Sequence, residues 1–228
     1  MRQRPELTGL PGIAETILTE ALVDRLPDNR AEAPWSVQCR AMMWLGRGGA
    51  AARSALSPAL SRSSALAVVG GFVRYSATPV GPYDEVLGLV ASRDGRNPFG
   101  TVAFMSVDSE ESLVGGRTNW AMPKTLASFT GEIDREMTAS ASDGPQWTVG
   151  AHAHSLGPEL PLHSTGQARQ EFADGSVRAS RLEFRGTARP ALVTVAVSSH
   201  GDLARWLRPG RHPGVVISHA EFTLGAAS

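Results

Sequence analysis

Cysteine and lysine are nearly absent from this chain of 228 residues, since each occurs only once. The single cysteine, Cys39, cannot form an internal disulfide, which fits a reducing cytoplasm. The formal net charge is +0 and no basic stripe alternates with aromatic residues, so nucleic acid is not an expected partner. No apolar run approaches the roughly 20 residues of a membrane span, and residues 1–11 contain no apolar signal-peptide core. We therefore expect a cytoplasmic protein that contacts neither nucleic acid nor a membrane.

Hydrophobic residues make up 42% of the chain and charged residues 19%, so a packed core is expected. Residues 14–26 carry apolar side chains at helical spacing and predict an amphipathic helix, which a polar linker over residues 27–34 follows. We predict one domain over residues 1–228, with residues 1–33 as its N-terminal helix and linker.

The chain from Trp35 onwards consists of short runs rich in Val, Leu and Phe. Turn signals such as Asp143-Gly144 and Asp174-Gly175 separate these runs. Many strands, hairpin turns and few helices predict an α+β, mainly β fold: a curled or closed antiparallel β-barrel with a few flanking helices. Short helices are predicted at 50–59 and 201–207, and strands at 38–45, 66–76, 85–92, 100–107, 128–135, 136–142, 146–154, 167–172, 176–184, 191–198 and 215–224.

Lys124 is the only lysine among 22 basic residues. Arginine can replace lysine almost anywhere on a solvated surface. It cannot replace a lysine whose amine must lose its proton and attack a carbonyl, because a guanidinium stays charged. The retention of one lysine therefore suggests amine chemistry, with a surface lysine left by chance as the alternative.

The residues before Lys124 predict a rigid bend. Gly115-Gly116 permits a tight or left-handed turn, and Pro123 fixes its own backbone. With Trp120 and Met122 as apolar neighbours, the amine of Lys124 is expected to be poorly solvated, which lowers its pKa and favours the neutral form that carbonyl attack requires. The alternative is a tight turn whose lysine points into water.

Two segments resemble those of acetoacetate decarboxylases. Gly116-Arg117-x-x-x-Ala121-x-Pro123-Lys124-x-Leu126 is similar to that family's G-R-x-x-x-[aromatic or small]-x-P-K-K-L signature, which implies that Lys124 forms the Schiff base. Gly81-Pro82-Tyr83-Asp84-Glu85 resembles the segment that ends in an active-site glutamate, which implies a proton-transfer role for Glu85.

The resemblance also implies residues that contact the substrate. Arg40, on the strand after Pro34-Trp35, or Arg117 would hold a substrate carboxylate. Trp120, Met122 and Tyr83 would line the pocket. For Glu85 and Arg117 the alternative is a structural salt bridge.

The sequence departs from the family's pattern at two places. Thr125 stands where the decarboxylases carry a second lysine, and a second glutamate would fall near Gly70 or Gly71, neither of which can replace it. The resemblance therefore implies chemistry at Lys124 more directly than it implies acetoacetate as the substrate.

The expected function is that of a Schiff-base lyase acting on a small β-keto or 2-oxo acid, decarboxylase-like, without a cofactor and as a homo-oligomer. An aldolase, dehydratase or cyclase of the same superfamily is an alternative, as are a non-catalytic barrel that binds a hydrophobic ligand and a scaffold subunit of a larger assembly. His152, His154 and His163 lack a cysteine or carboxylate at ligand spacing, so no metal is expected.

Overall fold

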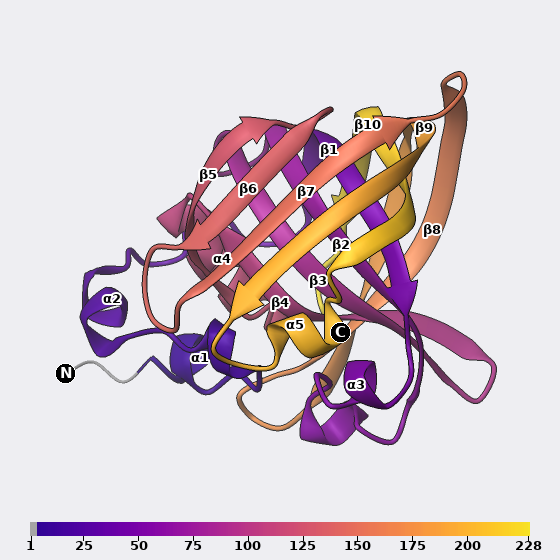
Figure 1. The fold of residues 1–228 in the computed structure, drawn as a ribbon. Helices are drawn as coiled ribbons and strands as arrows, with labels where there is room; N and C mark the ends of the chain where they lie inside the picture. The colour runs from indigo at the N-terminus through magenta and orange to yellow at the C-terminus, as the bar shows by residue number, and fades with distance from the viewer. Residues whose placement is uncertain (1–3) are drawn as a thin grey trace.

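The computed structural model describes residues 4–228, and its strands curl into a ring with short helices gathered at one end (Figure 1). The strands are β1 (Trp35–Arg47), β2 (Ser64–Ala77), β3 (Tyr83–Asp94), β4 (Asn97–Val107), β5 (Lys124–Glu132), β6 (Glu136–Ala141), β7 (Trp147–Ser155), β8 (Leu160–Glu171), β9 (Val177–Ser199) and β10 (Gly210–Leu224). The helices are α1 (Pro5–Thr8), α2 (Glu20–Arg25), α3 (Ala50–Arg53), α4 (Glu110–Trp120) and α5 (Leu203–Trp206), with 3-10 turns at Ala14–Thr16 and Pro58–Leu60.

The sheet is almost entirely antiparallel and closes on itself. Its order is β10-β1-β2-β3-β4-β5-β6-β7-β9-β8, and the additional pairing of β9 with β10 completes the ring. Only β4 makes parallel pairs in the described part of the chain, over three residues with β5 and at the single bridge Gly100–Ala168 with β8. The predicted fold class, a mainly β curled or closed antiparallel sheet with few helices, is confirmed.

Strands β1 to β4 contribute to two cores, because successive side chains of a strand point to opposite faces. Phe72 and Phe104 point into the ring, toward β5, β6 and β7, which lie across from β2 and β3 in Figure 1. Their chain neighbours Val73 and Met105 point to the other face, where they pack with side chains of α1 and α4. The second face, covered by helices, is the one that carries the candidate site.

The helix predicted over residues 14–26 is interrupted. A 3-10 turn covers Ala14–Thr16, and α2 begins only after Thr19, whose hydroxyl accepts a hydrogen bond from the amide of Leu22. Glu15, 1% exposed, explains the break, because its carboxylate accepts hydrogen bonds from distant groups in the region 199–203. These long-range contacts outweigh the helical spacing of the apolar residues.

Helix α4 was not predicted from the sequence. Gly115-Gly116 lies within this helix instead of forming a turn, and the left-handed residue is Ala121, with a φ of 52°, at the helix C-terminus. Ser109 begins the helix by accepting a hydrogen bond from the amide of Ser112. No helix within residues 4–228 has both the length and the apolar character needed to cross a membrane.

Candidate active site

A cavity of about 250 Å³ lies on the helix-covered face of the sheet, and Lys124 is in its wall. Apolar side chains make up most of the lining. The chain's only lysine, its only cysteine, Cys39, and both of its tyrosines, Tyr75 and Tyr83, line this one cavity. Three rare residue types therefore converge on one place from strands β1, β2, β3 and β5.

The amine of Lys124 is enclosed by polar partners, and the residue is 3% exposed. Nζ donates a hydrogen bond of 2.9 Å to Oε2 of Glu85 and another of 2.9 Å to Oγ of Ser112. It also lies 5.1 Å from the centroid of the Tyr83 ring. The lysine does not point into water, and the alternative of a solvated turn lysine is excluded.

The pKa of Lys124 is raised above its ordinary value, contrary to the expectation from the sequence. Burial is the largest single influence and lowers this pKa, but attraction to the Glu85 and Tyr83 side chains and hydrogen bonds to them together outweigh it. Without a substrate, the site therefore contains the Lys124 ammonium paired with the Glu85 carboxylate, and the surrounding side chains are mostly apolar.

Both tyrosines are neutral in this site. Burial is the main reason why the pKa of Tyr83 is raised and that of Tyr75 lies well above its usual range. The Tyr75 hydroxyl donates a hydrogen bond of 3.1 Å to Oε1 of Glu85, so the two carboxylate oxygens of Glu85 have different partners, Tyr75 and Lys124. The two tyrosine rings are 4.4 Å apart between centroids.

The backbone between α4 and β5 places the lysine. Ala121 in its left-handed conformation turns the chain back, so that the amide of Met122 bonds the carbonyl of Gly116. Lys124 then begins β5, paired with Met105 of β4. A Cβ at Gly116 would lie 2.6 Å from Cδ and Cε of Lys124, so the glycine leaves the space in which the lysine side chain lies against the helix.

Arg117 is buried behind the site and does not line the cavity. Its guanidinium donates hydrogen bonds to three main-chain carbonyls, those of Leu7, Thr16 and Lys124. Burial lowers the pKa of Arg117 to about 9. Arg117 thus connects the N-terminal segment to the start of β5 through main-chain carbonyls. It does not line the cavity and makes no salt bridge among the described residues.

Replacing Arg117 by lysine is expected to lower the free energy of unfolding by about 3 kcal/mol, because an ammonium cannot reach three carbonyls that a planar guanidinium serves at once. The matched control is Arg40→Lys at an exposed position, which should change stability by less than about 0.5 kcal/mol. Denaturant unfolding of both variants measures the difference. Equal effects in the two variants would show that the three carbonyl contacts contribute nothing.

Arg40 does not reach the cavity, and its predicted position is wrong. Cys39 and Ala41 of β1 face the cavity, so the side chain between them points to the opposite side. There the Arg40 side chain is 46% exposed and hydrogen-bonded to Asp134 at 3.3 Å. The other predicted wall residues, Trp120, Met122 and Tyr83, do line the cavity.

The positions that depart from the family's pattern lie outside the cavity lining. Thr125 is buried on the face of β5 opposite Lys124, where its hydroxyl is hydrogen-bonded to that of Ser106. Gly70 lies against the Trp44 ring and Gly71 against the Met43 side chain. The second lysine and the second glutamate of the family pattern, expected from the resemblance at Thr125 and near Gly70 or Gly71, thus have no charged counterpart here.

Sequence reasoning missed two polar members of the site, Ser112 and Tyr75. The rarity of tyrosine is the signal that could have found Tyr75, since the chain has only two. Ser112 stands in a helix that was not predicted, so the sequence contained no comparable signal for it. Across residues 4–228, no group of three or more His, Cys, Asp and Glu side chains is placed to hold a metal ion.

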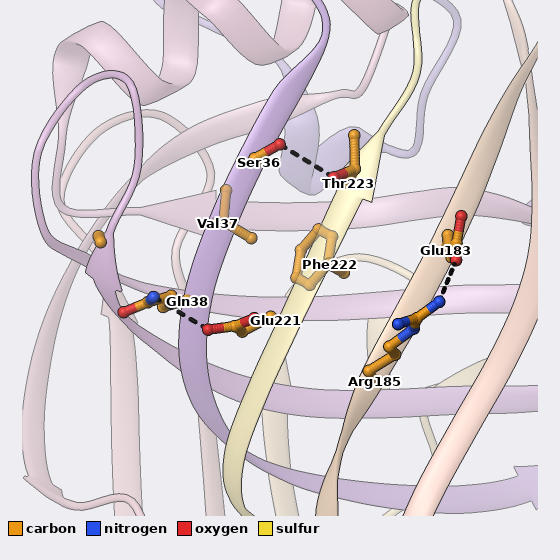
Figure 2. A pocket seen from close by; sticks show the side chains of 9 residues that line it. Ser36, Val37, Gln38, Glu183, Arg185, Glu221, Phe222 and Thr223 are labelled. Atoms are coloured by element: carbon orange, nitrogen blue, oxygen red, sulfur yellow. Dashed lines mark hydrogen bonds and ion pairs between the residues drawn. The ribbon is translucent and has the colours of Figure 1, made fainter.

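A wider concavity of about 490 Å³ is lined by residues of β1, β2, β9 and β10 (Figure 2). Its polar side chains pair across the strands: Ser36 with Thr223, and Gln38 with Glu221, at 2.9 and 3.0 Å. Arg185 pairs with Glu183 on β9. The polar groups drawn in Figure 2 are thus engaged with one another, whereas the amine of Lys124 lies in an apolar cavity.

The family model for acetoacetate decarboxylase matches residues 48–202, more than half of the chain. The chain belongs to the acetoacetate decarboxylase family. An acetoacetate decarboxylase from Legionella pneumophila shares its fold at 15% identity and a TM-score of 0.59, over 90% of this chain and 92% of that chain. No curated protein sequence matches this member of the family.

The enduracididine biosynthesis enzyme MppR has the same fold at 16% identity and a TM-score of 0.57. Its complex with pyruvate matches 87% of this chain and 90% of that chain. A second MppR structure, which covers 87% of this chain and 89% of that chain, contains the condensation product of pyruvate and imidazole 4-carboxaldehyde. At these identities the solved structures show a common fold, while the family match rests on residues 48–202.

Proposed function

We propose that this family member is a Schiff-base-forming lyase in which Lys124 condenses with the carbonyl group of a small substrate. The observation that supports this most strongly is a lone lysine in an apolar cavity, with its amine 2.9 Å from the carboxylate of Glu85. A lysine kept only for its charge could be replaced by arginine, whereas a lysine that forms an imine could not.

Glu85 is proposed to accept the proton that makes the amine nucleophilic. Transfer from the Lys124 ammonium to the Glu85 carboxylate changes an ion pair into two neutral groups, which an apolar cavity favours once a substrate excludes water. The neutral amine adds to the carbonyl carbon to give a carbinolamine. Proton return from Glu85 then releases the carbinolamine oxygen as water and leaves an iminium paired with the carboxylate.

The iminium withdraws electrons from the adjacent carbon, so a bond to that carbon can break and leave an enamine. Loss of CO2 from a β-keto acid would be decarboxylation, and loss of a proton to Glu85 would prepare the enamine for condensation with an aldehyde. The MppR structure with a condensation product makes this second reaction the runner-up. Pyruvate, which MppR binds, is a 2-oxo acid of the kind expected from the sequence, so it is one of the compounds with which the proposal is tested.

Borohydride trapping followed by intact mass measurement tests the proposal. The panel consists of acetoacetate, pyruvate and uncharged methyl ketones. The expected result is one adduct per chain with at least one of these compounds, absent in Lys124→Arg. Since Lys124 is the only lysine, that variant separates the side chain from the N-terminal amine. The absence of an adduct across the whole panel would instead favour a barrel that binds an apolar ligand without chemistry.

A further inference from the structure

The charge balance of the Lys124 cavity limits the kind of molecule that can enter it. Among the cavity-lining residues, all within the described range 4–228, only Cys39, Tyr75, Tyr83, Glu85 and Lys124 are titratable. Burial raises the pKa of Cys39 to about 12, so its thiol is neutral like the two tyrosines. The cavity thus contains one cation and one anion, and they are hydrogen-bonded to each other at 2.9 Å.

Neither arginine expected to hold a substrate carboxylate is available to do so. Arg40 lies on the other side of β1 in contact with Asp134. The guanidinium of Arg117 is engaged with three main-chain carbonyls behind β5. A carboxylate that entered the cavity would therefore have to compete with Glu85 for Lys124, or remain unpaired beside aliphatic and aromatic side chains.

Imine formation does not remove this difficulty. The amine and an uncharged ketone give an iminium and water, so the total charge of the iminium and Glu85 stays zero. A keto acid adds a second negative charge to the same enclosed space and leaves one anion without a counter-ion, which is strongly unfavourable away from water.

The rest of the lining is apolar and therefore favours an uncharged, hydrophobic molecule. Trp35, Val73, Leu87 and Met105 provide a buried wall, and half-buried side chains such as Leu182 complete it toward the surface. An apolar cavity of about 150 Å³ accommodates a benzene molecule, so one of about 250 Å³ has room for a chain or ring of about ten non-hydrogen atoms.

We infer that the natural substrate of Lys124 is an uncharged, apolar ketone or aldehyde of about this size, and not a small keto acid. The inference rests on the proposed Schiff base at Lys124 and adds the substrate class to it. Proton transfer from the α-carbon of the iminium to Glu85 gives a neutral enamine and a neutral acid, so condensation or isomerisation proceeds without a carboxylate in the substrate.

Trapping with a matched pair of compounds tests the inference. 7-Oxooctanoic acid and its methyl ester have the same methyl ketone, and their difference in charge lies far from the reacting carbon. Trapping rates are divided by those of free butylamine under the same conditions to correct for intrinsic reactivity. We expect the ester to form the Lys124 adduct at least about tenfold faster than the acid, because the acid must leave its charge unpaired.

Each outcome has a distinct meaning. Equal trapping, or faster trapping of the acid, overturns the inference while the adduct itself keeps the proposed Schiff base. No adduct with either compound or with the wider panel rejects the proposed function, and the inference with it. Arg40→Ala serves as the control, since an exposed arginine on the far side of β1 should leave the ratio unchanged. A selective loss of acid trapping in this variant would show that Arg40 reaches the substrate and would also overturn the inference.

Discussion

Glu85→Gln is expected to lower the free energy of unfolding at pH 7 by about 3 kcal/mol. Glutamine keeps the size of the side chain but removes the charge that compensates the Lys124 ammonium. Lys124 is 3% exposed, so water cannot take over that role. Removing one partner of a buried ion pair leaves the other as an uncompensated charge, which is far more destabilising than the loss of a surface pair.

The same substitution is expected to reverse the direction of the Lys124 pKa shift and of the pH dependence of stability. In the wild type the pKa is raised, so the contribution of Lys124 is fully present below the unfolded value of about 10.4 and is lost as the pH rises through the higher folded value. In the variant, burial remains as the dominant influence and lowers the pKa. The unfolded state then binds more protons, so stability increases from pH 7 to about pH 10.

A single lysine makes this measurement direct. Incorporation of lysine labelled with 13C at the ε-carbon gives one side-chain signal, and its shift against pH reports the pKa of Lys124. Unfolding by denaturant at several pH values gives the stability. Glu183→Gln is the matched control, because Glu183 pairs with Arg185 at 3.1 Å but is 48% exposed. A variant at Glu85 no different from this control would mean that the Lys124–Glu85 pair is not formed in solution.

The strand pattern was predictable because it depends on local sequence. Runs rich in Val, Leu and Phe, separated by turns such as Asp-Gly, predicted most of the strands. Lys124 stood out as the only lysine among 22 basic residues. Glu85 was assigned only because the segment from Gly81 resembles one of the acetoacetate decarboxylases, and the structure brings it to Lys124.

Helix α4 and the orientation of Arg40 were not predictable in the same way. Glycine is unfavourable in a helix, so Gly115-Gly116 suggested a turn. The helix contains these glycines because two side chains from the sheet approach its backbone. Trp35 of β1 lies against Gly115, and Lys124 of β5 lies against Gly116. Alternation along β1 defined two faces, yet both are partly buried, with Cys39 on one and Met42 on the other. Which face borders the cavity depends on where α4 packs, and this is a tertiary property.

The pKa of Lys124 shows the same limit. The sequence indicated an apolar surrounding and hence a lowered pKa, and burial does act in that direction. Glu85 lies 39 positions away in the chain, with its partner Tyr75 on the neighbouring strand, and the pair overrides burial. A site in which amine and carboxylate neutralise each other is chemically different from one in which an isolated amine is deprotonated by its environment.

Gly116→Ala is expected to slow imine formation about 100-fold without unfolding the protein. The added methyl group would lie 2.6 Å from Cδ and Cε of Lys124, which must then move. Movement of the lysine side chain displaces Nζ from Glu85 and Ser112. A displacement of about 1 Å in a reacting group lowers the rate about 100-fold. The lysine side chain is flexible, and alanine favours the helix by about 1 kcal/mol, so the net change in stability should be small.

Gly115→Ala is the matched control on the adjacent position of the same helix. Here the methyl group would lie 2.5 Å from the Trp35 ring, which is rigid and whose Nε1 donates a hydrogen bond to the carbonyl of Ala31. Such overpacking should lower the free energy of unfolding by about 2 kcal/mol. Trapping rates and denaturant unfolding of both variants separate the two effects. If Gly116→Ala trapped ketones at the wild-type rate, the position of the Lys124 amine relative to Glu85 would not control imine formation, and the role proposed for the ion pair would be wrong.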